Sequence, residues 1–121
     1  MIVDDEEAIR DSLMMGLEEY GWETLGAHSA ATALEFEAPF DIYLIDLGLP
    51  DKSGFELTKD LRAKFGQVPI VILSGYLNNE IEQEAKTLGI REVLRKPFRF
   101  ENLDRVLSST LKVNSAKLSV F

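Results

Sequence analysis

The chain has 121 residues, 45% of them hydrophobic, which is enough for one domain with a buried core and too little for two. Its 13 basic and 21 acidic side chains give a net charge of −8, which argues against DNA, RNA or an anionic membrane as a direct partner. The absence of cysteine excludes disulfides and thiolate metal sites. No apolar run approaches the roughly 20 residues of a membrane span, and the acidic amino terminus is unlike a signal peptide, so we expect a cytoplasmic protein.

Short apolar runs alternate with amphipathic stretches along the chain, which is the pattern of repeated strand and helix units. The runs expected to be strands are residues 2–3, 22–27, 42–45, 70–73 and 93–94. Five stretches are expected to be helices. The first is 7–20, the second lies between Ser29 and Pro39, and the fifth runs from Phe100 to Leu111. The third contains Leu57, Leu61 and Phe65, and the fourth contains Ile81, Ala85 and Leu88. Glycines at 21, 66 and 89 are expected to end helices.

Five strands that are each followed by a helix predict an α/β fold, because right-handed crossovers make such a sheet parallel. We expect one domain over residues 1–111 and a tail or linker over 112–121. The first strand has almost nothing before Ile2, although an inner strand normally has about five residues. We therefore expect that strand to be truncated and the chain to come from a longer sequence.

Functional side chains follow four of the five strands, at the end of the sheet where ligands bind in this class of fold. They are Asp4 and Asp5 after the first strand, Asp46 after the third, Ser74 after the fourth and Lys96 after the fifth. Each has a structural explanation when taken alone: acidic residues favour a helix start, and aspartate or serine favours a turn. Only their joint placement at one edge of the sheet indicates a site.

Three carboxylates in one pocket repel each other unless a hard cation such as Mg²⁺ lies between them. An ammonium group and a hydroxyl suit phosphoryl oxygens, so the set is arranged for attack on phosphorus and formation of an aspartyl phosphate. Asp46, on the central strand, is the expected nucleophile. Ser74 is the alternative, but it would need a base, and the only histidine, His28, is expected to be an ordinary surface residue.

These motifs resemble the receiver domain of two-component response regulators, over essentially the whole chain. The matching stretches are Ile2 to Glu6, Leu44 to Pro50 with Gly54, Val71 to Tyr76, and Lys96-Pro97-Phe98. The resemblance implies a flavodoxin-like (βα)5 fold with strand order 2-1-3-4-5. It also implies that Lys96 precedes a cis proline peptide bond.

The same resemblance implies roles for single residues. Asp46 would accept a phosphoryl group from a kinase histidine, and Ser74 and Lys96 would contact that group. Mg²⁺ would be held by Asp4, Asp5 and Asp46, with the backbone carbonyl of Gly48. The chain would then be a regulatory phosphoacceptor and not a turnover enzyme, catalysing only its own phosphotransfer and dephosphorylation.

Three positions depart from the family pattern or bear on its chemistry. Val93 stands where the family has an aromatic side chain that couples to the hydroxyl, so we expect switching to use movement of the Ser74 loop, with Tyr76. Gly48 and Tyr76 flank the path of an attacking water, and Gly48 has no side chain to orient it. We therefore expect slow dephosphorylation.

Three other functions compete with the receiver-domain interpretation. A phosphatase of the haloacid dehalogenase type would need an aspartate where Gly48 stands, and a flavin or nucleotide domain would need a Gly/Ser/Thr-rich loop where the acidic segment 4–7 lies. A degenerate receiver that only binds protein is the lesser interpretation, because all the reactive positions are filled.

The expected partners are a sensor histidine kinase or phosphotransfer protein and an effector domain outside this chain. The face of the last two helices and the last strand is where the family usually exchanges partners, so the chain would be a monomer or a phosphorylation-dependent dimer. The charged residues expected on this face are Arg91, Glu92, Arg95 and Arg99.

Overall fold

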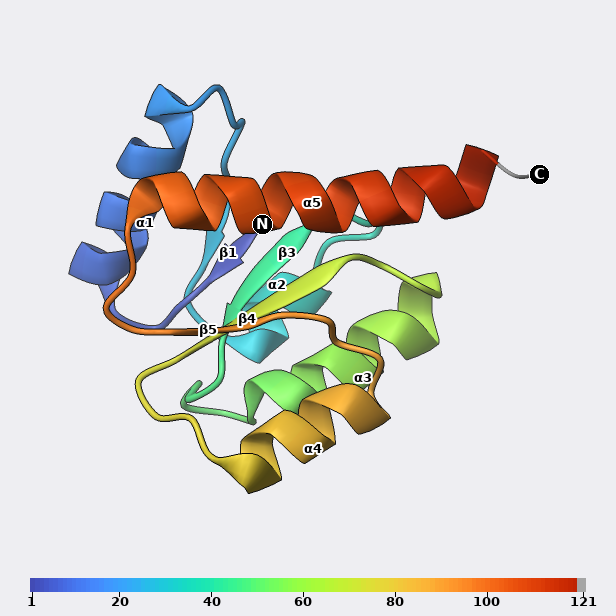
Figure 1. Cartoon of the computed structure of the whole chain (residues 1–121). Helices are drawn as coiled ribbons and strands as arrows, with labels where there is room; N and C mark the ends of the chain where they lie inside the picture. The colour runs from blue at the N-terminus through green and yellow to red at the C-terminus, as the bar shows by residue number, and fades with distance from the viewer. Residues whose placement is uncertain (120–121) are drawn as a thin grey trace.

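A computed structural model describes the backbone of residues 1–119 and the side chains of residues 1–112. Its strands form one parallel sheet in the order β2-β1-β3-β4-β5, which confirms the predicted fold class and topology (Figure 1). The strands are β1 (Ile2–Val3), β2 (Gly26–Ala27), β3 (Tyr43–Asp46), β4 (Ile70–Ser74) and β5 (Val93–Arg95). All five residues of β4 are buried, as expected for an inner parallel strand that is covered on both faces.

The helices are α1 (Glu7–Glu19), α2 (Ala30–Leu34), α3 (Gly54–Phe65), α4 (Asn79–Thr87) and α5 (Phe100–Ser119). α1 and α5 cover one face of the sheet, and α2, α3 and α4 cover the other (Figure 1). Two hydrophobic clusters follow this division, because Leu13 and Leu17 of α1 pack with Leu103 and Leu107 of α5. The other cluster joins α2, α3 and α4 to the opposite side chains of the same strands.

Local sequence signals explain most helix boundaries. Ser29 caps α2 by accepting a hydrogen bond from the backbone N–H of Thr32, and Ser53 and Asn78 cap α3 and α4 in the same way. The three glycines expected to end helices have positive φ angles of 93°, 83° and 70°, a region that favours glycine. Ser53 and Asn78 therefore fix where the loops after β3 and β4 end, and the glycines fix where helices end before the next strand.

The structure differs from the sequence-based boundaries by more than one residue at two elements. β2 covers only Gly26–Ala27 and not 22–27, because its neighbour β1 offers only two residues for pairing. α5 continues past Leu111 to Ser119, in a segment without proline or glycine, so most of the expected tail 112–121 is helical; residues 120–121 lie outside the described residues. No helix in the described part of the chain is long and apolar enough to cross a membrane.

Candidate functional site

The loops that follow β1, β3, β4 and β5 gather at one edge of the sheet, on the left in Figure 1. This edge brings together the carboxylates of Asp4, Asp5 and Asp46, each with an oxygen within 4.8 Å of the others. The pairing of β1 with β3 explains why Asp4 and Asp46 lie close together. Val3 lies opposite Ile45, and the two aspartates are the residues that follow them. The three aspartates predicted from strand ends therefore form one cluster.

Asp4 is the buried member of the cluster, with only 2% of its surface exposed. Its Oδ1 accepts a hydrogen bond of 2.9 Å from the backbone N–H of Glu6. Within the described part of the chain its Oδ2 has no hydrogen-bond partner. Burial raises the pKa of Asp4, and the charges of Asp46 and Asp5 add to this effect against the opposing Glu6 hydrogen bond and Lys96 charge.

Lys96 balances part of this negative charge. Its Nζ donates a 2.8 Å hydrogen bond to Asp46 Oδ1 and lies 3.8 Å from Asp4 Oδ2. Burial alone would lower the pKa of Lys96, but the hydrogen bond and charge of Asp46, with the charge of Asp4, raise it above its ordinary value. The Lys96–Pro97 peptide bond is cis, as the family resemblance implied.

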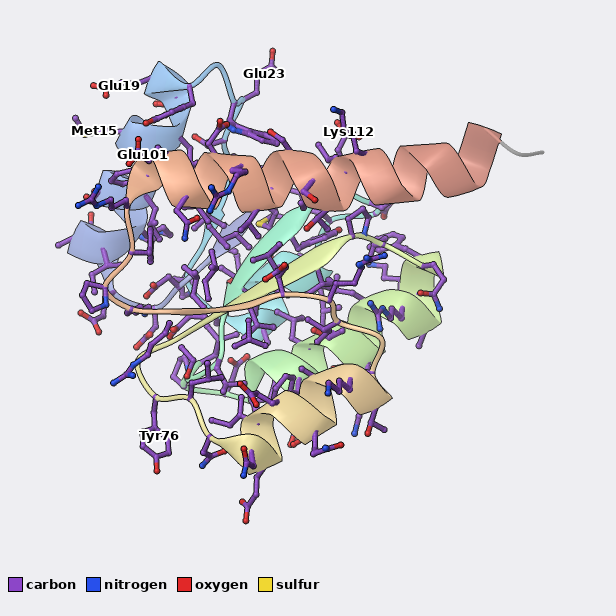
Figure 2. The ribbon with its side chains drawn as sticks, viewed as in Figure 1. Met15, Glu19, Glu23, Tyr76, Glu101 and Lys112 are labelled. Carbon is purple, nitrogen blue, oxygen red and sulfur yellow. The ribbon has the colours of Figure 1, made fainter. Side chains whose placement is uncertain are left out.

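Ser74 ends β4 and is buried, but its hydroxyl is engaged by its own loop. Oγ donates to the backbone carbonyl of Tyr76 and accepts from the Tyr76 N–H at 3.1 Å. The Tyr76 ring is 66% exposed and points away from the body of the molecule (Figure 2). Ser74 therefore lies at the predicted edge with its hydroxyl turned toward the loop backbone.

Two glycines shape the pocket near Asp46. A Cβ atom built on Gly48 would lie 4.0 Å from Asp46 Oδ2 and meet nothing closer, so there is room for a side chain beside the carboxylate. A Cβ atom built on Gly54 would lie 2.9 Å from the backbone oxygen of Asp46 and 3.1 Å from Leu47 Cα. Gly54 therefore allows α3 to start close against the end of β3.

Arg10 is a residue of the site's surroundings that the sequence analysis missed. Its Nη1 donates a 2.8 Å hydrogen bond to the backbone carbonyl of Asp4, from the first turns of α1. Its side chain crosses β2 at Gly26, where a Cβ atom would lie 2.9 Å from Arg10 Cδ. No local pattern could have found this contact, because it depends on how α1 packs over β2.

The expectation for His28 agrees with the structure, and several aromatic side chains have packing roles. His28 is exposed at the loop after β2, and Phe55 is buried in the core. Phe98 and Phe100 are partly buried against the α1/α5 cluster. Trp22 is partly buried and donates a 2.8 Å hydrogen bond from Nε1 to Asp104.

The cluster as a whole carries three carboxylates against one ammonium group. This charge set suits a hard divalent cation, which takes oxygen ligands and leaves positions open for further oxygens. The buried Oδ2 of Asp4 supports this fit, because among the described residues it accepts no hydrogen bond, Lys96 Nζ is 3.8 Å away, and a buried anionic oxygen that accepts no hydrogen bond is costly. The arrangement can therefore bind a cation and present Asp46 to an incoming electrophile.

Comparison with known proteins identifies the class of domain. The family model for the response regulator receiver domain matches residues 1–108. The chain is 35% identical to the KDP operon transcriptional regulatory protein KdpE of Escherichia coli over 118 residues, which is 96% of this chain and 52% of that protein. It belongs to the receiver domain family, whose members are the phosphoacceptor signalling domains of two-component systems.

Solved structures agree with this assignment. The chemotaxis protein CheY4 of Vibrio cholerae has a TM-score of 0.83 and 32% identity, covering 90% of this chain and 94% of that one. A CheY-like receiver domain from Methanospirillum hungatei has a TM-score of 0.87 and 28% identity, covering 96% of this chain and 94% of that one. The chain spans about half or less of the curated relatives it matches, which include transcriptional regulatory proteins.

Proposed function

We propose that Asp46 is the phosphoacceptor of this receiver domain and takes a phosphoryl group from the phosphohistidine of a sensor kinase or phosphotransfer protein. The observation that carries the proposal is the position of Asp46 between a lysine and two further carboxylates. Lys96 Nζ lies 2.8 Å from its Oδ1, and Asp4 and Asp5 each have an oxygen within 4.8 Å of it. Asp46 itself is 13% exposed, so an oxygen can be reached from solvent.

Mg²⁺ is the cation that these residues fit best. Asp4, Asp5 and Asp46 would hold it, with the backbone carbonyl of Gly48, and the set offers only oxygen ligands. When bound, the ion supplies positive charge to the oxygens of the phosphoryl group. It would also relieve the repulsion from Asp46 and Asp5, which adds to the effect of burial in raising the pKa of Asp4.

The chain's own residues perform the transfer. An Asp46 carboxylate oxygen attacks phosphorus, and the bond between phosphorus and the donor imidazole nitrogen breaks. The imidazole leaves with the electron pair and takes up a proton, and the product is an aspartyl phosphate. The Lys96 ammonium group, already at Asp46, neutralises charge on the phosphoryl oxygens.

Ser74 would connect the new charge to the surface of the domain. For its hydroxyl to reach a phosphoryl oxygen, it must give up its bonds to the Tyr76 backbone, and the loop between β4 and α4 would move with it. Val93 has no ring to rotate, so we expect the signal to run through this loop. The altered surface would be read by an effector domain outside this chain or by a phosphorylation-dependent second copy, in the cytoplasm.

The experiment that tests the proposal locates the phosphoryl group. The protein is incubated with Mg²⁺ and phosphoramidate, whose phosphorus–nitrogen bond is of the same type as that of phosphohistidine. Borohydride then reduces an aspartyl phosphate to homoserine, and peptide mass spectrometry finds the modified residue. We expect homoserine at position 46 alone, whereas stable phosphate on Ser74 or no modification anywhere would contradict the proposal.

A further inference from the structure

The segment 47–53 between β3 and α3 carries Gly48, and its backbone is fixed at both ends. The Leu47 N–H donates to Leu73 O at 2.8 Å, and the Gly54 N–H donates to Leu47 O at 2.9 Å. Leu49 is buried in the core next to Gly48. The middle of the segment, after Pro50, has no such backbone bond among the described contacts and depends on side chains for its position.

Asp51 provides that anchor by reaching a different element. Its Oδ1 accepts the backbone N–H of Ala30 at 3.1 Å, and its Oδ2 accepts the N–H of Ala31 at 2.9 Å. These amides lie at the start of α2, where helix N–H groups lack partners within the helix. The hydrogen bond from Ala31 lowers the pKa of Asp51, with a further contribution from Ala30.

Ser29 does not duplicate this contact, because its hydroxyl caps Thr32 instead. Ala30 itself is fully buried in the core, so the start of α2 is a rigid point. The carboxylate of Asp51 therefore joins a loop of the site to a fixed part of the scaffold 21 residues away in sequence.

The other end of α2 is held by a residue that does not belong to this loop. Lys64 of α3 donates from Nζ to the carbonyls of Leu34 at 2.7 Å and Phe36 at 2.8 Å. α2 is thus hydrogen-bonded at both ends, and among the described hydrogen bonds only those of Asp51 link it to the segment that carries Gly48. A variant of Lys64 disturbs α2 alone, whereas a variant of Asp51 also releases segment 47–53. Comparing the two variants therefore separates the stability of α2 from the position of the loop.

We propose that Asp51 is a positioning residue for the cation site, which holds the Gly48 carbonyl in place by tying segment 47–53 to the start of α2. The inference rests on the proposed function, because that function assigns the carbonyl to Mg²⁺. It also implies a reciprocal effect: Mg²⁺ bound at the site should strengthen the contact between Asp51 and α2.

The test measures Mg²⁺ affinity by calorimetry at 150 mM salt for four variants beside the unmodified chain. Asp51→Ala removes both hydrogen bonds, and Asp51→Asn keeps one acceptor oxygen. Lys64→Met releases the other end of α2. Glu56→Gln removes one exposed negative charge from the first turn of α3 and so controls for the charge lost at Asp51.

We expect Asp51→Ala to raise the Kd for Mg²⁺ about 3- to 10-fold and Asp51→Asn to fall between it and the unmodified chain. Glu56→Gln and Lys64→Met should stay within about twofold. Hydrogen exchange should show the amides of Ala30 and Ala31 slowed by Mg²⁺ in the unmodified chain and unaffected by Mg²⁺ in Asp51→Ala. A merely structural role would lower the stability of Asp51→Ala but leave its Kd unchanged.

The outcomes separate the two proposals. If the unmodified chain binds Mg²⁺ and Asp51→Ala binds it equally well, or if Glu56→Gln or Lys64→Met weakens binding as much, the role of Asp51 is overturned and the proposed function stands. If the unmodified chain does not bind Mg²⁺, the proposed function is overturned, and the positioning role falls with it.

Discussion

Replacing Asp4 by asparagine should stabilise the metal-free protein while removing its cation site. Asp4 is 2% exposed and clusters with two further carboxylates, and among the described residues its Oδ2 has no hydrogen-bond partner and lies 3.8 Å from Lys96 Nζ. Asparagine keeps Oδ1 for the Glu6 N–H and removes the buried negative charge that Asp46 and Asp5 repel. It also loses the 3.8 Å ion pair with Lys96, which Lys96 offsets by keeping its 2.8 Å hydrogen bond to Asp46, so the substitution should remove more repulsion than attraction.

The expected gain can be set from the cost of the unsatisfied oxygen. Leaving a buried acceptor without a partner costs about 1–3 kcal/mol. For a domain of this size 1 kcal/mol corresponds to about 4 °C, so Asp4→Asn should raise the Tm in EDTA at pH 7 by about 4–12 °C. Asp11→Asn removes an exposed carboxylate from α1 and should stay within about 0.5 kcal/mol of the unmodified chain.

The pH dependence of this difference has a definite sign. The pKa of Asp4 is raised above 3.8 in the folded state, so the folded protein holds that proton more tightly than the unfolded chain does. The ionised group lowers stability above its folded pKa, and the penalty disappears as the pH falls through that value. The advantage of Asp4→Asn should therefore be full at pH 7 and shrink as the pH falls toward and below the raised pKa.

Mg²⁺ should stabilise the unmodified protein but not Asp4→Asn, and so narrow the difference in stability between them. At a free concentration ten times its Kd, a ligand that binds only the folded state adds about 1.4 kcal/mol to the free energy of unfolding. We expect this increase for the unmodified chain and little or none for Asp4→Asn, measured by thermal and urea unfolding with EDTA or Mg²⁺. The reasoning would be refuted if Asp4→Asn were less stable than the unmodified chain in EDTA at pH 7.

Three further predictions concern the same pocket. Lys96→Met should abolish the mass gain from a small phosphodonor, because Lys96 contacts the Asp46 carboxylate. It should still bind Mg²⁺ when measured by calorimetry, because Lys96 is not a ligand of the ion. Loss of both properties would assign Lys96 a wider role. Gly54→Ala should lower the free energy of unfolding, measured in urea, by about 1–3 kcal/mol, because the added Cβ would lie 2.9 Å from the Asp46 carbonyl oxygen. Gly75→Ala should cost far less, because a Cβ added at Gly75 has no atom within 4 Å. The phosphorylated protein should decay slowly, followed by intact mass after donor removal, and Gly48→Gln should shorten its half-life by orienting a water; a half-life of seconds for the unmodified chain would contradict this.

The sequence predicts what depends on local signals. The run 70–73, flanked by Pro69 and Ser74, favours a buried strand, and the alternation with amphipathic stretches predicts a parallel sheet, whereas the order of the strands follows from the family resemblance. Ser29 and the glycines at 21, 66 and 89 are recognisable because capping and positive φ are properties of a few neighbouring residues. The residues after each strand could be assigned to one edge, because parallel strands end together.

Contacts between distant elements could not be predicted in the same way. Trp22 bonds to Asp104 across 82 residues, and Arg10 reaches the Asp4 carbonyl only because α1 packs over Gly26. The acceptor role of Asp51 depends on where α2 begins in space and not on its neighbours in sequence. The sequence predicts too long a β2 for a related reason. A strand extends only as far as its partner pairs with it, and β1 pairs with β2 at two residues.

The central claim, that Asp46 accepts a phosphoryl group in a Mg²⁺-dependent reaction, is tested most directly by intact mass. The protein is incubated with acetyl phosphate in Mg²⁺ or in EDTA, beside Asp46→Asn under the same conditions. The account predicts a gain of one phosphoryl group only in the unmodified protein and only with Mg²⁺. An equal gain in Asp46→Asn or in EDTA, or no gain together with no Mg²⁺ binding, would contradict it, and the last outcome would favour a domain that only binds protein.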